Sequence, residues 1–291
     1  MQQVELKPVL LATFAATIWG LWWVPIRWLE AQGLSGAMGG IAMNAGAFLA
    51  GLIWMFARRI PLQLGGHALL GTALAGAAVG SYSVALVYGD VVRVVLLFYL
   101  APAWSKIIEW TFLGQPWRWA SSVALVAAFT GAVLVLGGAV SFADLSAGDL
   151  VAVVSGLFWA CGAALVFTAP KSSPASLTVT TALAAALIGV PFVIAEGAAL
   201  PPVAPVATGL AAGVVYVLPI LGLTLWSARI LPPATLTFLL TAEIVAGVVS
   251  GALFLDEPFG PLQIAGAALI ILAALSELLP RLRPAATEES A

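Results

Sequence analysis

The feature that most constrains this chain is a series of apolar stretches, each long enough to cross a bilayer as a helix. A hydrocarbon core of about 30 Å needs about 20 such residues at about 1.5 Å per residue. Ten stretches qualify, near residues 8–28, 36–57, 68–88, 94–113, 118–138, 148–169, 176–196, 205–227, 234–255 and 261–279. Only 8% of residues are charged, and the mean hydropathy is +1.10. The sequence therefore predicts an all-α integral membrane protein with ten transmembrane helices.

The few polar residues exclude several classes of function. A net charge of -2 provides no basic surface for nucleic acid. One histidine and one cysteine supply no metal-binding set, so we expect no metal and no cofactor. The segment Gly33–Gly36 resembles the Gly-x-Ser-Gly motif of intramembrane serine proteases, but His67 falls on the other predicted side of the membrane. The chain is not expected to be an enzyme, and its expected partners are the lipid bilayer and a small-molecule substrate. The oligomeric state is left open.

The positions of lysine and arginine predict the orientation, because cytoplasmic loops carry the positive excess. With the N-terminus inside, eight of the eleven basic residues are cytoplasmic: Lys7, Arg58, Arg59, Arg118, Lys171, Arg229, Arg281 and Arg283. Both termini are thus predicted to be cytoplasmic, with residues 281–291 as a tail. We expect the bacterial inner (plasma) membrane.

The chain repeats itself at a nearly constant spacing. Pro102 aligns with Ile244, and Pro116 with Pro258, at an offset of 142, while Trp19 aligns with Trp159 at 140. The pattern predicts two five-helix repeats, residues 1–140 and 141–280. Because five is odd, the second repeat is expected to be inverted. Inverted repeats place a binding site near the middle of the membrane and permit alternating access, which is typical of transporters.

These motifs carry a resemblance to a known family. Trp19-Gly20, the segment Tyr99–Pro102 and the turns Gly114–Pro116 and Asp256–Pro258 resemble the EamA-type repeats of the drug/metabolite transporter superfamily. The chain is most similar to the exporters of aromatic amino acids in that superfamily. The resemblance implies ten helices, cytoplasmic termini, export of aromatic amino acids and a central cavity lined by both halves. Where the second repeat often has Glu-Pro, this chain has Glu243-Ile244.

Ionisable residues within the membrane are the first candidates for a substrate site, because each costs about 2.5–3.5 kcal/mol on insertion. Glu243 falls near the middle of its helix, where it suits a substrate ammonium group or a proton. The competing interpretation is a protonated carboxyl bonded to hydroxyl groups. Lys106 is a candidate for a substrate carboxylate or for the electrostatics of the cavity. It lies three residues before Glu109 and therefore can instead pair with it.

Aromatic residues and one proline complete the predicted substrate-binding set. Trp19, Tyr82, Tyr99 and Trp159 lie deep in their helices, where they can stack on a flat solute and donate a hydrogen bond. Pro102 removes a backbone hydrogen bond and is a candidate hinge. Trp22 and its neighbour Trp23 fall near the membrane edge, and we assign them to the interfacial aromatic belt.

The sequence thus predicts export of small metabolites, most simply aromatic or other apolar amino acids, by alternating access. Three alternatives stay open. Another substrate of the superfamily, such as a nucleotide sugar, a drug or a quaternary amine, is the first; a cavity with an acid and no cation favours the amine. A membrane enzyme needs a hidden catalytic pair, and a non-transporting scaffold would have a sealed interface between its halves.

Overall fold

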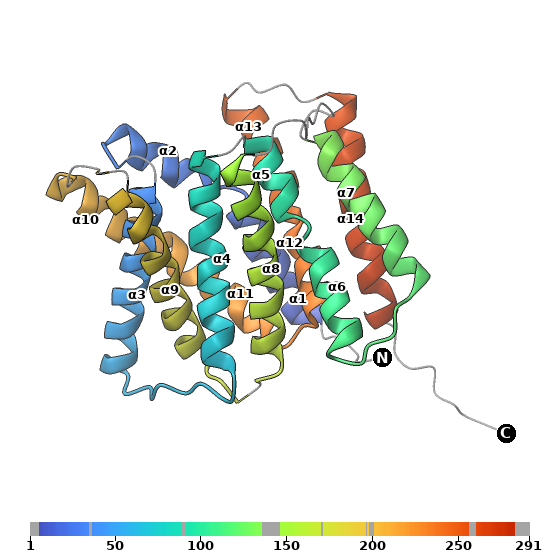
Figure 1. Ribbon diagram of the computed structural model, residues 1–291, viewed down its shortest axis with the longest axis horizontal. Helices are drawn as coiled ribbons and strands as arrows, with labels where there is room; N and C mark the ends of the chain where they lie inside the picture. Colours follow the sequence, from blue (N-terminus) through green and yellow to red (C-terminus); the bar gives the residue numbers. More distant parts are fainter. Residues whose placement is uncertain are drawn as a thin grey trace.

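The computed structural model describes residues 6–34, 37–88, 91–135, 146–169, 171–195, 197, 201–255 and 260–282. Over these residues all regular structure is helical, and the helices form one bundle (Figure 1). Nine helical segments among them are long and apolar enough to cross a membrane, and Trp119–Val135 is a shorter apolar helix. The described residues therefore have the all-helical, apolar architecture expected of an integral membrane protein.

The first half of the chain contributes seven helices. They are α1 (Leu6–Trp19), α2 (Trp23–Ala31), α3 (Ala37–Ala57), α4 (Ala68–Tyr88), α5 (Val91–Phe98), α6 (Ala101–Thr111) and α7 (Trp119–Val135). The second half contributes α8 (Ala147–Phe167), α9 (Pro174–Ala195), α10 (Val203–Ala212), a π-helical turn η1 (Gly213–Val217), α11 (Leu218–Ala228), α12 (Pro233–Leu240), α13 (Ala242–Leu255) and α14 (Pro261–Leu282).

Three of the predicted helices are broken in the middle, and only the break near Pro102 had a signal in the sequence. The stretch 94–113 divides into α5 and α6 at Tyr99 and Leu100, and 234–255 divides into α12 and α13 at Thr241. Tyr99 and Thr241 are 142 residues apart, so the two breaks occupy equivalent positions in the repeat. The stretch 8–28 divides after Trp19. Interrupted helices within a membrane are tolerated where the backbone is buried in protein or lines a cavity.

Two of the three breaks have an identifiable local feature. Pro102 is near the N-terminus of α6, where a missing N–H group costs no helical hydrogen bond. The α12–α13 break has no proline. There the Thr241 hydroxyl donates to the carbonyl oxygen of Phe238 at 2.6 Å, and the Thr241 N–H donates to the same oxygen at 3.2 Å. A polar side chain thus stabilises a tight turn that interrupts the helix.

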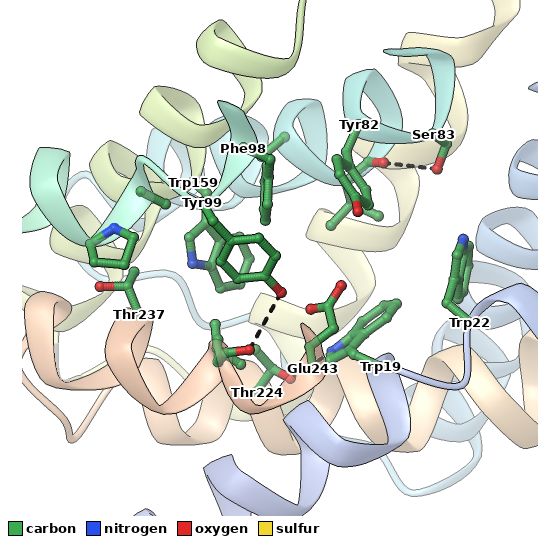
Figure 2. A pocket seen from close by; sticks show the side chains of 15 residues that line it. Trp19, Trp22, Tyr82, Ser83, Phe98, Tyr99, Trp159, Thr224, Thr237 and Glu243 are labelled. Carbon is green, nitrogen blue, oxygen red and sulfur yellow. Dashed lines mark hydrogen bonds between the residues drawn. The ribbon is translucent and has the colours of Figure 1, made fainter. Parts of the chain in front are cut away.

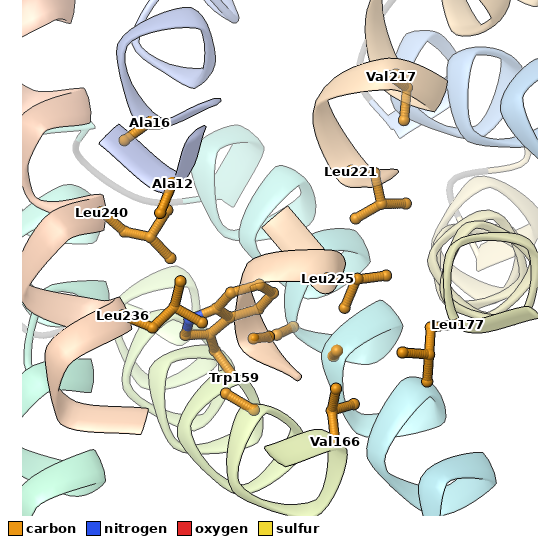
Figure 3. Packing of buried hydrophobic residues seen from close by; sticks show 14 of the residues in the cluster. Ala12, Ala16, Trp159, Val166, Leu177, Val217, Leu221, Leu225, Leu236 and Leu240 are labelled. Atoms are coloured by element: carbon orange, nitrogen blue, oxygen red, sulfur yellow. The ribbon is translucent and has the colours of Figure 1, made fainter. Parts of the chain in front are cut away.

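The core of the bundle is built around α12. All eight of its residues are buried, and it packs against α1 and α6. Figure 3 shows Leu236 and Leu240 of α12 beside Trp159 of α8, with Leu221 and Leu225 of α11 nearby. This central helix therefore links the two halves of the chain.

Several connections meet at one end of the bundle. The Gln63 N–H donates to the Ser176 hydroxyl at 2.9 Å, and Arg229 Nη1 donates to the Ser172 carbonyl oxygen at 2.9 Å. The α3–α4 and α8–α9 connections and the end of α11 therefore lie together, at the lower side of Figure 1. We call this the basic end, because it carries Lys7, Arg58, Arg59, Lys171 and Arg229. That the basic end faces the cytoplasm stays a prediction.

Candidate functional site

A cavity lies between the two halves, at the level of the helix breaks. It holds about 710 Å³ of empty space, counting its open mouth. Fifteen residues line it: Trp19, Trp22, Ala78, Val79, Tyr82, Ser83, Phe98, Tyr99, Ala101, Pro102, Trp159, Thr224, Thr237, Leu240 and Glu243. They come from α1, α4, α5, α6, α8, α11, α12 and α13 and from the turns at the breaks. The cavity is therefore built by both repeats.

Six of the fifteen lining residues are aromatic. The rings of Tyr82 and Phe98 are 4.5 Å apart between centroids, and those of Phe98 and Tyr99 meet edge to face at 5.4 Å. Across the cavity, the rings of Trp19 and Trp22 are 5.2 Å apart (Figure 2). Tilted and edge-to-face pairs are the arrangements that aromatic side chains prefer, and together these rings give the cavity a largely aromatic, apolar lining.

Glu243 is the one acidic or basic side chain among the described residues that line the cavity. It lies in the first turn of α13, directly after the break at Thr241. Gly20, at the end of α1, packs directly on the start of α13. A Cβ atom at position 20 would lie 2.5 Å from the Glu243 carbonyl oxygen. Close contact between α1 and α13 therefore needs a residue without a side chain at position 20.

Hydroxyl groups and indole nitrogens provide the other polar atoms of the cavity. The Tyr99 hydroxyl lies beside the Glu243 carboxyl group and within 3.4 Å of the Leu240 carbonyl oxygen (Figure 2). Trp19 Nε1 donates to the Thr224 hydroxyl at 3.1 Å. Trp159 is only 5% exposed, and its Nε1 has no hydrogen-bond partner among the described residues. A buried donor without an acceptor is costly, so this group suits a ligand.

The structure brings six of the seven predicted site residues to this cavity. They are Trp19, Tyr82, Tyr99, Pro102, Trp159 and Glu243. Their contact with a substrate remains a prediction. Lys106 is not among the lining residues, and it lies one turn further along α6.

Other lining residues were missed from the sequence. Trp22 was assigned to the membrane edge, but the chain turns after Trp19 and brings the Trp22 ring to the cavity, so that assignment was wrong. Phe98 adjoins the predicted Tyr99, and its position was a usable signal. Thr224 and Thr237 are two of several hydroxyl residues in apolar helices, a weaker signal.

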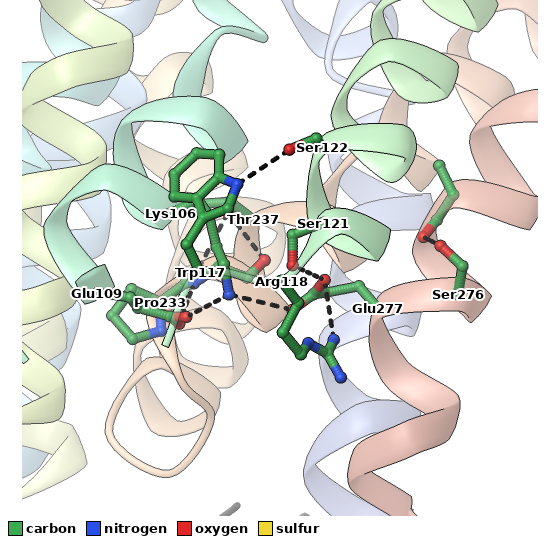
Figure 4. A network of polar contacts seen from close by, with 12 residues as sticks. Lys106, Glu109, Trp117, Arg118, Ser121, Ser122, Pro233, Thr237, Ser276 and Glu277 are labelled. Carbon is green, nitrogen blue, oxygen red and sulfur yellow. Dashed lines mark hydrogen bonds and ion pairs between the residues drawn. The ribbon is translucent and has the colours of Figure 1, made fainter. Parts of the chain in front are cut away.

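Lys106 belongs to a buried cluster of charges near the basic end (Figure 4). Its Nζ lies 3.5 Å from Glu109 Oε2 and 3.6 Å from Glu277 Oε1. Glu277 Oε2 in turn lies 3.4 Å from Arg118 Nη2 and accepts a hydrogen bond from the Ser121 hydroxyl at 3.0 Å. The pairing of Lys106 with Glu109 that their spacing allowed is therefore present, and Lys106 also contacts α14.

Comparisons with known proteins agree with this architecture. A family model described as the EamA-like transporter family matches the chain twice, at residues 6–137 and 146–276. No curated protein matches. Among solved structures, the crystal structure of one protein matches with a TM-score of 0.72 and 17% identity, over 95% of this chain and 99% of the other. At that identity the likeness shows the fold alone.

Proposed function

Because the chain belongs to the EamA-like transporter family, we propose that it exports small amphipathic solutes by alternating access between two inverted halves. The family makes the protein a membrane transporter of the drug/metabolite transporter superfamily. The inverted arrangement, the direction of transport and the substrate class are the parts that we propose.

The packing of the helices supports two equivalent halves. In the first half α4 packs on α8 and α9. In the second half the corresponding segment is α10, η1 and α11. Its α11 packs on α1, and all three of its parts pack on α3. Likewise α5 and α6 pack on α8, while α12 and α13 pack on α1. Exchanging the halves thus preserves these contacts, as expected for a two-fold relation.

The directions of the first helices support the inversion. The Ser227 hydroxyl donates to the carbonyl oxygen of Pro8 at 3.4 Å, so α1 begins at the basic end, where α11 ends. Ser172, just after α8, contacts Arg229 at that same end. Since α1 begins where α8 ends, the two equivalent helices run in opposite directions. A cavity between inverted halves can open to either side by rocking.

One observation carries the substrate class: among the described lining residues a single carboxyl group, that of Glu243, faces a wall of six aromatic rings. A carboxylate binds an ammonium group, and aromatic faces attract both cations and flat apolar groups. We therefore infer a solute with a protonated or quaternary amine and a flat apolar body. No lysine, arginine or histidine is among the described lining residues to pair with a carboxylate, which favours the amine over the amino acid.

Export of aromatic amino acids is the second candidate, and the Trp159 indole favours it. Its N–H group is buried and has no acceptor among the described residues, so it can donate to a carboxylate bound opposite Glu243. A scaffold with sealed halves is disfavoured by the cavity itself. We place the protein in the bacterial inner membrane with the basic end in the cytoplasm.

The test is transport into liposomes that contain the purified protein, using solutes that differ only in the carboxylate. Tryptamine is compared with tryptophan and phenethylamine with phenylalanine, with protein-free liposomes as the control for passive entry. Methyl viologen serves as a permanent cation. Saturable movement of the amines and methyl viologen supports the amine assignment, and movement of the amino acids alone supports the second candidate. No saturable movement of any solute contradicts the proposed substrate classes.

A further inference from the structure

We propose that the buried cluster of Lys106, Glu109, Glu277 and Arg118 is a latch that holds the cavity closed at the basic end. The latch must open before a solute can enter or leave on that side. This inference rests on the alternating access of the proposed function, but it does not depend on which solute is carried.

The cluster lies between the cavity and the basic end. Pro102 lines the cavity, and Ser105, Lys106 and Glu109 follow it on the buried face of α6. Residues three and four apart share one helix face. This face of α6 therefore runs from the lining of the cavity to the cluster, so a movement of α6 that opens the cavity toward the basic end would disturb both.

The contacts of the cluster join the two halves of the chain. Lys106 on α6 pairs with Glu277 on α14, and Arg118, just before α7, pairs with the same carboxylate (Figure 4). Glu109 Oε1 also accepts a hydrogen bond from the Ala234 N–H at 2.8 Å. That N–H is in the first turn of α12, where a carboxylate is favoured by the helix dipole. Rocking of one half against the other must break these contacts.

Three of the four side chains in the cluster are deeply buried, and Arg118 is 26% exposed. The side chains of Lys106, Glu109 and Glu277 are at most 1% exposed. A buried ion pair gives little net stability compared with apolar packing, so its presence suggests a need for a contact that can open. Water entering from the basic end would hydrate the separated charges. The separated charges therefore cost less free energy in the open state, where water reaches them, than they would in the dry closed state.

The repeat does not duplicate the charges of α6. At the offset of 142, Lys106 corresponds to Val248 and Glu109 to Gly251. The duplicated helix therefore carries no charges at the matching places. A device that both halves needed for folding would be expected in both copies. Its single occurrence favours a role in setting which end is closed.

Two hydroxyl groups beside the cluster fit a region that becomes wet on opening. Ser105 Oγ and Thr235 Oγ1 are buried, and neither has a hydrogen-bond partner among the described residues. Ser105 precedes Lys106, and Thr235 follows Ala234, which Glu109 caps. Buried hydroxyls without partners are rare in closed protein interiors. Here water would satisfy both when the latch separates.

The test measures access to two introduced thiols from the two sides of the membrane. Ser105→Cys reports on the latch, and Ser83→Cys reports on the cavity wall nearer the opposite end, each in a Cys161→Ala background. Both are compared with and without the triple change Lys106→Met, Glu109→Gln and Glu277→Gln, which removes the three buried charges, keeps similar shapes and leaves only the partly exposed Arg118 charged. Lys171→Met, at the same end but exposed in a loop, is the matched control. An impermeant maleimide is added to inside-out or right-side-out vesicles.

We expect the triple change to speed labelling of the Ser105→Cys variant from the basic end by about tenfold or more. Labelling of the Ser83→Cys variant from the opposite end should slow. Lys171→Met should change neither rate. Unchanged rates, or faster labelling of both thiols, would overturn the latch, because the second result means general loosening of the fold. These rates need no solute. If the wild-type protein transports a solute but the triple change does not shift the labelling rates, the latch alone is refuted.

Discussion

Gly20 packs directly on the backbone of Glu243, with room for no side chain between them: a Cβ atom at position 20 would lie 2.5 Å from the Glu243 carbonyl oxygen. It would also lie 2.7 Å from the Ala246 Cβ atom. This contact joins the end of α1 to the start of α13 and therefore fixes the position of the only acid in the described cavity wall. Close backbone approach is what small residues provide in membrane helices.

Gly20→Ala is expected to destabilise the protein by about 1–3 kcal/mol through overpacking. Gly222→Ala is the matched control, since its Cβ atom would meet only the Thr178 hydroxyl at 3.6 Å. There the better helix propensity of alanine should add up to about 1 kcal/mol. Thermal unfolding of the purified variants in one detergent compares them, and equal melting temperatures would contradict the close contact.

Glu243→Gln should reduce transport of an amine by about tenfold or more, because a charge-assisted bond contributes about 1.5–3 kcal/mol. The amount of protein in the membrane should stay the same. Glu30→Gln, an exposed acid on α2, is the control and should transport normally. Normal amine transport by Glu243→Gln would show that the carboxyl group is structural.

Trp159→Phe keeps an aromatic ring and removes the indole N–H. If that group binds a substrate carboxylate, tryptophan transport should fall by about two- to tenfold while tryptamine transport is unchanged. Trp104→Phe is a close control, because Trp104 Nε1 is also buried without a partner among the described residues but does not line the cavity. An equal loss for both solutes would assign Trp159 to packing.

Lys106→Met alone should destabilise the fold by about 3–5 kcal/mol, because it leaves the buried carboxylates of Glu109 and Glu277 without this cation. Adding Glu109→Gln and Glu277→Gln should recover much of that loss. The measurement is again thermal unfolding in detergent. If the single variant is as stable as the wild type, Lys106 does not form ion pairs with Glu109 and Glu277 in the purified protein.

A reporter fused after Ala291 should behave as cytoplasmic. The same orientation requires that a cysteine placed at Lys171 be labelled only from the cytoplasmic side, because Lys171 lies at the basic end. Labelling from the outer side would reverse the predicted orientation, and a periplasmic reporter at the C-terminus would contradict the even number of spans.

The cavity shows what could be inferred from single residues. Tyr82, Tyr99, Trp159 and Glu243 were recognised because large polar-tipped or ionisable groups are costly within a membrane unless something specific binds them. Trp22 was not recognised, because its distance from the helix start suggested the membrane edge. The direction of its ring depends on the turn after Trp19, which no periodicity in the sequence reveals.

The sequence by itself determined the apolar helices and the repeat. The length of an apolar stretch is a local property, and the thickness of the bilayer sets the length that a spanning helix needs. Only the tertiary structure decided where the helices break, which residues face the cavity and what Lys106 contacts. Glu277 lies 171 residues from Lys106 in the chain, and the two side chains meet because α12 packs on both α6 and α14. Such pairings depend on packing between distant segments, which one sequence does not specify residue by residue.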